Sequence, residues 1–493
     1  MSARMVLFQL ERMGDLAQTL PALEGLVRGG VETRLVVRRH LLGLARLLAP
    51  EAVECVAVAD VSLLEVEKAC RRGDPAARTM AAELAAPLAR PGDLVVNLSY
   101  HQAGALLATA AAGEAAWGPW VSAAGERLIR GVWATYLLAA VDARPAGRVH
   151  MTDLRRLVCA EALGRELPVW KPMTASRPGT GGLRVGLVTG AGDPARRSSA
   201  RWLQTLAQML VDAGYRLVLL GGEEDRSRAD TLARGLTTPP RNRVGTTTLE
   251  EVVGEVRRLD LVVGFDTGPV HLASACGTPV VMVLGGGAHY WETGPWGEGD
   301  LALQALEVGR AEVDGVPPSV VVAACRARLE GLGCPDSGAG YRVLRVEPAP
   351  PSDRLGGIVY GHRGRVAAAL AQRRLLAAFG APPADHPEGA ECAAGQAARQ
   401  GCRQAAQALE ALGSGDPRQA AGHLQALAAS IEDLLEKTRG EAETRLIGAW
   451  VAALLEHLPP SAPDQTARVC GRILRRALSA LGAASPALAH DRI

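Results

Sequence analysis

The sequence predicts an α/β fold with two Rossmann-like domains that face a cleft, followed by a C-terminal extension made only of helices. Strand-length apolar runs alternate with helical runs in two separate parts of the chain, and such alternation implies parallel sheets with right-handed crossovers. Between these parts lies a segment rich in Pro, Gly, Ser and Thr, residues 168–182, which is typical of a linker. Beyond about residue 340 the strand pattern gives way to Ala-, Arg- and Gln-rich helical sequence.

The first domain, predicted to span residues 1–175, begins with a strand, a tight turn and a helix. Apolar residues run from Met5 to Leu10, and Glu11–Gly14 form the turn. Asp15 then opens the helix at the carboxyl end of the strand, where open α/β sheets bind their ligands. Asp15 is therefore either a helix N-cap or a group that faces a ligand. Further strands are predicted at 33–37, 54–57 and 93–98.

The second domain, predicted to span residues 183–340, carries the most informative local pattern. A buried strand at 260–265 leads into the loop Asp266–Pro269 and then into a short helix. Asp266 and Thr267 are good N-cap residues, and Pro269 suits the first helical turn. The backbone N–H groups at such a helix start favour a diphosphate. The other elements predicted here are strands at 183–190 and 215–220 and a helix at 199–213.

The predicted extension, residues 358–493, contains an apolar stripe at helical spacing that includes His423, Leu427 and Ile431. We expect about four or five helices packed as a small bundle. Such a stripe forms a core more often than a partner site, and both roles stay open.

Composition, net charge and apolar patterning argue against several classes of protein. The net charge of +2 gives no argument for a nucleic-acid partner. No apolar run approaches the length needed to cross a bilayer, and the N-terminus lacks a signal-peptide pattern. The nine cysteines form no C-x-x-C pair. We therefore expect a reduced cytoplasmic protein without disulfides or structural zinc.

Two motifs in fitting order carry a family resemblance. MGDLAQTLPAL occupies residues 13–23, and DTGPVHLASACGTPVVMVLGG occupies residues 266–286. Together they resemble the ADP-heptose:lipopolysaccharide heptosyltransferases and their relatives in glycosyltransferase family 9, over roughly residues 4–300. The resemblance implies the two-domain GT-B fold, with the acceptor bound by the first domain and the nucleotide-sugar donor bound by the second.

The resemblance also implies roles for single residues. Asp15 is the expected catalytic base, with Gly14 and His101 on the acceptor side. The acidic residue on the nucleotide ribose is expected at Glu224, and Glu223 is an equally good candidate by register. His271 either touches the ligand or ties its loop down. The expected donor-binding residues are Thr189, Gly190, Arg197, Arg201, Glu224, Asp266, Thr267, Gly268 and His271.

This chain departs from the family pattern at two places. The lysine that supports the diphosphate in relatives falls at Ala200, so we expect Arg196, Arg197 or Arg201 to supply the charge. Relatives tend to have an acidic residue near Asn97, so the acceptor of this chain is open to difference. No Asp-x-Asp pair occurs in a loop suited to a metal, and we expect no metal and no cofactor.

The leading hypothesis is an inverting, metal-independent glycosyltransferase that moves a sugar, first of all heptose from ADP-heptose, to a cell-envelope saccharide such as the lipopolysaccharide core. A lipid-linked acceptor would bring it to the inner face of the cytoplasmic membrane, and a protein partner bound through the C-terminal helices stays open. One alternative keeps the fold and changes the nucleotide sugar or the glycan. Another is a binding or scaffold protein with a degraded donor site. A nicotinamide dehydrogenase is disfavoured because no G-x-G-x-x-G follows the first strand.

Overall fold

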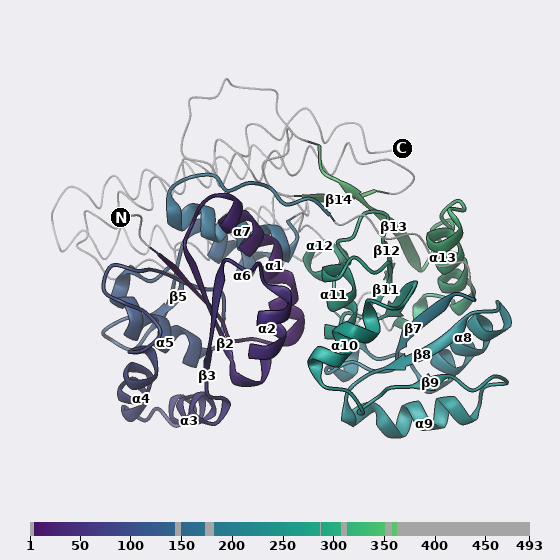
Figure 1. The fold of residues 1–493 in the computed structure, drawn as a ribbon, viewed down its shortest axis with the longest axis horizontal. Helices are drawn as coiled ribbons and strands as arrows, with labels where there is room; N and C mark the ends of the chain where they lie inside the picture. The colour runs from purple at the N-terminus through teal and green to yellow at the C-terminus, as the bar shows by residue number, and fades with distance from the viewer. Residues whose placement is uncertain are drawn as a thin grey trace, which may run out of the picture.

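The computed structural model describes residues 4–142, 149–172, 182–285, 287–306, 313–350 and 357–361. These residues form two α/β domains that lie side by side, the first purple to blue and the second teal to green in Figure 1. Helices α1 and α2 of the first domain face α10 and α11 of the second. The predicted pair of Rossmann-like domains is confirmed. Apart from residues 358–361, the predicted helical extension lies outside the described residues, so it stays a prediction.

The first domain is built on a four-stranded parallel sheet in the order β3-β2-β1-β4. Strand β1, one of the two inner strands, is buried on both faces, as expected for a parallel sheet made from apolar runs. Leu7 of that strand pairs with Leu35 on one side and Val96 on the other. The four predicted strands are confirmed to within one residue as β1 Met5–Gln9, β2 Thr33–Arg38, β3 Val53–Val58 and β4 Leu94–Asn97.

Helices cover both faces of this sheet, and a short antiparallel hairpin extends the domain beside β4. Helix α1 begins at Met13, two residues earlier than predicted, so Asp15 is the third helical residue and not the first. The bounds are α1 Met13–Arg28, η1 Arg39–Leu41, α2 Leu42–Leu48, α3 Asp60–Arg71, α4 Ala76–Ala85, α5 Gln102–Ala112, η2 Gly113–Ala115, β5 Gly118–Val121, β6 Arg127–Arg130, α6 Val132–Asp142 and α7 Met151–Leu163.

The second domain contains an eight-stranded sheet in the order β14-β13-β12-β11-β10-β7-β8-β9. It extends past the predicted boundary at residue 340, because β13 pairs antiparallel with β12, and β14 with β13. The strands are β7 Arg184–Val188, β8 Arg216–Leu220, β9 Arg241–Asn242, β10 Leu261–Gly264, β11 Val280–Leu284, β12 Leu301–Ala305, β13 Tyr341–Pro348 and β14 Ile358–Gly361. The helices are η4 Pro194–Arg196, α8 Ala200–Asp212, η5 Glu223–Asp225, α9 Arg226–Arg234, α10 Leu249–Val256, α11 Gly268–Ala275, α12 Tyr290–Thr293, η6 Val313–Gly315 and α13 Pro318–Glu330.

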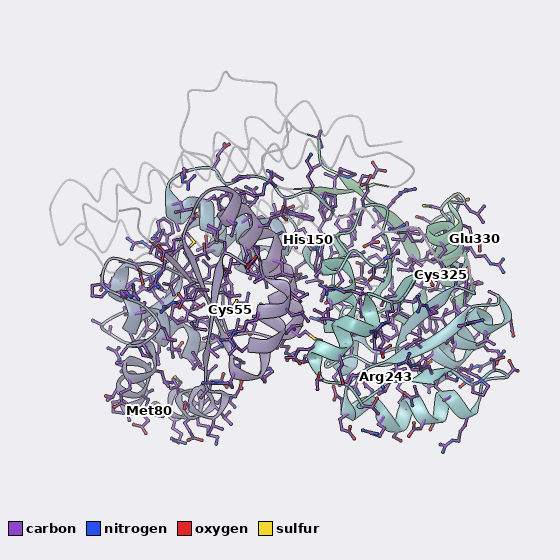
Figure 2. The ribbon with its side chains drawn as sticks, in the orientation of Figure 1. Cys55, Met80, His150, Arg243, Cys325 and Glu330 are labelled. Atoms are coloured by element: carbon purple, nitrogen blue, oxygen red, sulfur yellow. The ribbon has the colours of Figure 1, made fainter. Side chains whose placement is uncertain are left out.

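Hydrogen bonds join the two domains at the start of α7. His150, labelled at the junction in Figure 2, lies with its Nε2 2.9 Å from the carbonyl oxygen of Gly294. Asp153 of α7 accepts bonds from the Trp170 indole at 2.8 Å and from the Gly357 backbone N–H at 3.0 Å. Gly357, the residue before β14, is therefore bonded to the first domain, although β14 itself belongs to the second sheet.

Two findings concern the described residues as a whole. No helix among them is both long and apolar enough to span a membrane. The six cysteines in this part of the chain are all free.

Asp300 is a buried carboxyl group at the amino ends of β11 and β12. It accepts bonds from the backbone N–H groups of Val280 at 2.9 Å and Gly297 at 3.0 Å, and Arg328 lies 3.4 Å away. Burial raises the pKa of Asp300 to about 7, although the Arg328 charge opposes the shift. The folded state therefore holds a proton that the unfolded chain releases near pH 4.

This difference predicts that Asp300 makes the protein less stable as the pH rises from about 4 to about 7, by roughly 1.4 kcal/mol per pH unit at most. Urea unfolding of the wild type and Asp300→Asn across this range measures the effect. The variant is expected to lack this contribution, and Asp212→Asn, an exposed aspartate of α8, serves as the control. Identical pH profiles for the wild type and Asp300→Asn would contradict the prediction.

Candidate active site

A cavity of about 680 Å³ lies between the two domains. The first domain contributes the turn after β1 and the start of α1, and the second contributes the loops after β7, β8 and β10. These are carboxyl ends of parallel strands, where α/β sheets place their ligands. Predicted site residues from both domains line this cleft: Gly14, Asp15, Gly190, Glu224, Asp266, Thr267, Gly268 and His271.

Asp15 is held in place by Arg155, a residue that no sequence motif had indicated. Arg155 of α7 donates from Nη2 to Asp15 Oδ1 at 2.7 Å and from Nη1 to the Asp15 carbonyl oxygen. The second carboxylate oxygen accepts from the Arg12 backbone N–H at 3.3 Å. Asp15 is one-third exposed, whereas the Arg155 side chain is 5% exposed. The carboxylate is thus fixed in position and still reachable from the cleft.

Buried hydrogen bonds hold the turn that carries Asp15. The backbone N–H of Leu10 donates to Ser99 Oγ at 2.8 Å, and Glu11 Oε1 accepts from the Tyr100 backbone N–H at 3.0 Å. The end of β1 is therefore tied to the end of β4, and the start of α1 projects from a rigid base.

The position of Gly14 before the predicted helix suggested that this glycine permits a tight turn. The structure gives another reason: a larger side chain would not fit at this position. It lies inside α1, and its φ is not positive. A Cβ placed on Gly14 would lie 2.8 Å from Cδ2 of His271 and 3.6 Å from the Gly268 Cα. The first turns of α1 and α11 therefore touch across the cleft, and a glycine on each side permits it.

Asp266 is the centre of a buried polar cluster on the wall of the cleft that the second domain contributes. Its Oδ1 lies 2.9 Å from His271 Nε2, and its Oδ2 accepts from Arg196 Nη1 at 2.6 Å. Burial alone raises the pKa of Asp266, but the bond and charge of His271 and the charge of Arg196 outweigh burial and lower it. The His271 ring also stacks on Trp296, with ring centroids 5.6 Å apart. His271 therefore holds the loop, and it also lines the cleft.

The segment after β8 brings three carboxylates to the cleft. Glu223 and Glu224 are exposed, and Glu223 is paired with Arg226. Asp225, which the sequence analysis overlooked, is 5% exposed and packs against Gly190, where a Cβ would overlap its carboxylate. Burial raises the pKa of Asp225, and the charge of Glu224 adds to that shift. Three acidic residues in a row directly after a strand were the available signal.

Of the three arginines expected to replace the family lysine at Ala200, only Arg196 lines the cleft. Arg197 donates from Nε to the Ala191 carbonyl oxygen at 2.6 Å, which braces the loop after β7. Arg201 is exposed on α8 and lines neither this cleft nor the neighbouring cavity, because the helix turns Trp202 and Leu203 inward instead. Thr189 also lies outside the lining, buried with its hydroxyl 3.3 Å from the Leu220 carbonyl oxygen.

A second cavity, of about 630 Å³, adjoins the first on the side of the N-terminal domain. Glu11, Arg12 and Met13 line both cavities. His101 lines the second one and caps α5, where its Nδ1 accepts from the Gly104 N–H at 3.0 Å. The predicted acceptor-side residues Gly14 and His101 thus line two adjoining cavities, one each.

Part of the chain matches the model of a known protein family. Residues 185–312 match glycosyltransferase family 9 (heptosyltransferase). The chain is 30% identical over 110 residues to lipopolysaccharide heptosyltransferase 3 of Escherichia coli, which covers 21% of this chain and 32% of that protein. It is 31% identical over 96 residues to lipopolysaccharide heptosyltransferase 2 of Escherichia coli K12, covering 19% and 28%. The chain therefore aligns with about a third or less of the length of these relatives.

The crystal structure of the glycosyl transferase family 9 from Veillonella parvula DSM 2008 shares the fold. It matches with a TM-score of 0.52 at 18% identity, over 67% of this chain and 98% of that chain. The matched second domain, the relatives and this shared fold agree with the two motifs that meet in the cleft. The second domain thus matches glycosyltransferase family 9, and the chain is similar in sequence to lipopolysaccharide heptosyltransferases.

Proposed function

We propose that the protein is an inverting glycosyltransferase that moves a sugar from a nucleotide sugar to a saccharide of the cell envelope. ADP-heptose is the first donor to test, and the lipopolysaccharide core is the first acceptor, because the similar proteins are lipopolysaccharide heptosyltransferases. One observation carries the proposal: Asp15 and the Asp266–His271–Arg196 cluster lie on opposite walls of one cleft.

Asp15 has the position that a general base requires. It is a fixed carboxylate of the N-terminal wall, and the turn that carries it also lines the second cavity, which could hold the acceptor saccharide. Its carboxylate would take the proton from the acceptor hydroxyl as that oxygen attacks the anomeric carbon. Attack from the face opposite the leaving group inverts the configuration.

The donor wall has the groups that a leaving diphosphate requires. The start of α11 at Thr267 and Gly268 lines the cleft, and the first N–H groups of a helix have no partner within that helix. Arg196 lies beside them, fixed by Asp266. Among the described residues no group of His, Cys, Asp and Glu side chains is arranged to hold a metal ion. We therefore propose that N–H donors and arginine stabilise the leaving group.

Calorimetric titration with ADP, UDP, GDP and CDP, with EDTA present, tests the donor site. We expect selective binding of ADP, and ADP binding at least roughly tenfold weaker in Asp266→Ala, since Arg196 and His271 lose their shared partner. Turnover of ADP-heptose with EDTA present is the next expected result.

Each other outcome has a definite meaning. Preference for a different nucleotide would keep the transferase and change the donor. Turnover that requires an added divalent cation would overturn the metal-independent mechanism. Absence of nucleotide binding at millimolar concentration would contradict the proposed function and favour a binding protein with a degraded donor site.

A further inference from the structure

The charge of the cleft poses a problem for a diphosphate. Eight carboxylates line it: Glu11, Asp15, Asp193, Glu223, Glu224, Asp225, Asp266 and Glu292. Among the residues that the structure describes, only two arginines join them in the lining, Arg12 and Arg196. A cleft lined mainly by one sign of charge repels ligands of that sign. Binding of a diphosphate dianion therefore depends on cations that the acids leave available.

The charge of Arg196 is partly balanced by two carboxylates. Its Nη1 is bound to Asp266 at 2.6 Å, and its Nε lies 3.8 Å from the Asp193 carboxylate. Arg155 is likewise engaged with Asp15, and Arg226 with Glu223. Acidic side chains of the site thus balance part of the charge of these three guanidinium groups, Arg196 included, so Arg196 alone does not match the charge of a diphosphate.

Arg12 differs from all three. It forms no ion pair within the described part of the chain, and its side chain is exposed. Its Nη1 lies 3.7 Å from the point that a Cβ of Gly192 would occupy, so the guanidinium reaches across the cleft to the loop after β7. That loop, from Gly190 to Asp193, lines the donor side.

The backbone places Arg12 beside the reacting groups. The backbone N–H of Arg12 donates to Asp15 Oδ2 at 3.3 Å, so Arg12 and the proposed base Asp15 belong to the same turn. Arg12 also lines both cavities, which adjoin at this turn. A group at this junction would lie between the donor diphosphate and the acceptor.

We propose that Arg12 binds the diphosphate of the nucleotide donor from the N-terminal domain, so that the donor joins the two domains. The inference rests on the proposed function. As the bond between the anomeric carbon and the diphosphate oxygen breaks, the electron pair stays on that oxygen and the Arg12 guanidinium stabilises the charge. The acceptor oxygen forms the new bond to the anomeric carbon, and its proton passes to Asp15.

Calorimetry on the full chain with ADP, and displacement of ADP by inorganic pyrophosphate, tests this role. We expect ADP binding roughly ten- to a hundredfold weaker in Arg12→Ala, and partial recovery in Arg12→Lys, which keeps the charge but loses the planar fork. Pyrophosphate is expected to compete with ADP in the wild type and to lose most of that effect in Arg12→Ala. Adenosine, which has no phosphate, is expected to bind both proteins equally.

The matched control is Arg46→Ala, an exposed arginine of α2 that lines neither cavity and is expected to bind ADP like the wild type. Thermal unfolding establishes that each variant is folded. Unchanged ADP affinity in Arg12→Ala, equal losses for ADP and adenosine, or an equal loss in Arg46→Ala would each overturn the inference. Failure of the wild type to bind any of ADP, UDP, GDP and CDP would overturn the proposed function as well, and the wild type alone shows that.

Discussion

Replacement of Asp15 by asparagine is expected to lower turnover by roughly a hundred- to ten-thousandfold, the range that general-base catalysis contributes. Asparagine keeps an oxygen that can accept the Arg155 bond, so the start of α1 is expected to hold its place. Affinity for ADP is expected to stay near that of the wild type, because the donor is held mainly by other residues. Single-turnover kinetics with ADP-heptose, together with ADP calorimetry, measures both quantities.

Asp15→Ala with added formate separates a proton-transfer role from a structural one. A small carboxylate that enters the vacated space is expected to restore part of the turnover of Asp15→Ala and none of that of Asp15→Asn. Asp74→Asn, in the turn before α4, is the control for a lost charge, because Asp74 lines neither cavity. Turnover of Asp15→Asn within a few-fold of the wild type would contradict the base role.

The second large effect is expected for Gly14→Ala, in which only a methyl group is added. The new Cβ would lie 2.8 Å from the His271 ring. That ring is not free to move, because it is bonded to Asp266 and stacked on Trp296. The two domains must therefore shift apart, and a displacement of about 1 Å can lower turnover by roughly a hundredfold. Overpacking is expected to lower the free energy of unfolding by about 1–3 kcal/mol.

Gly254→Ala provides the matched control for Gly14→Ala. Gly254 also lies inside a helix, and a Cβ there would meet only Arg258 Nη1, at an ordinary contact distance of 3.8 Å. This control is expected to keep turnover and to be slightly more stable, because alanine suits a helix better than glycine. Equal behaviour of the two variants in turnover and urea unfolding would show that α1 and α11 do not need their close contact.

Much of the fold could be predicted from local pattern. Strand β1 and the apolar parts of β2 and β4 are continuous apolar runs, and such runs give strands buried in parallel sheets. The exposed position of Arg201 could also have been predicted, since Trp202, Leu203 and Leu206 mark the buried stripe of α8. Strands β13 and β14 were missed because β13 is neither a continuous apolar run nor a regular alternation of buried and exposed residues, and it lies beside a Pro- and Gly-rich segment.

The contacts that complete the site could not be predicted, because they join residues distant in sequence. Asp15 and Arg155 are 140 positions apart, and only the packing of α7 on α1 brings them together. The reason for Gly14 lies in His271, a residue of the other domain. A motif identifies which residues matter, but the partners that fix those residues come from the tertiary fold.

The antiparallel end of the second sheet has a practical consequence for experiments on shortened chains. A chain ended at residue 340 would lack β13 and β14 and leave β12 as an open edge. The unpaired N–H and C=O groups of such an edge recruit strands from other molecules, and aggregation follows. Truncation there would also remove the Gly357 bond to Asp153 and the bond from the Tyr360 hydroxyl to the Pro295 carbonyl oxygen. Any end before residue 361 therefore shortens the second sheet or removes these bonds.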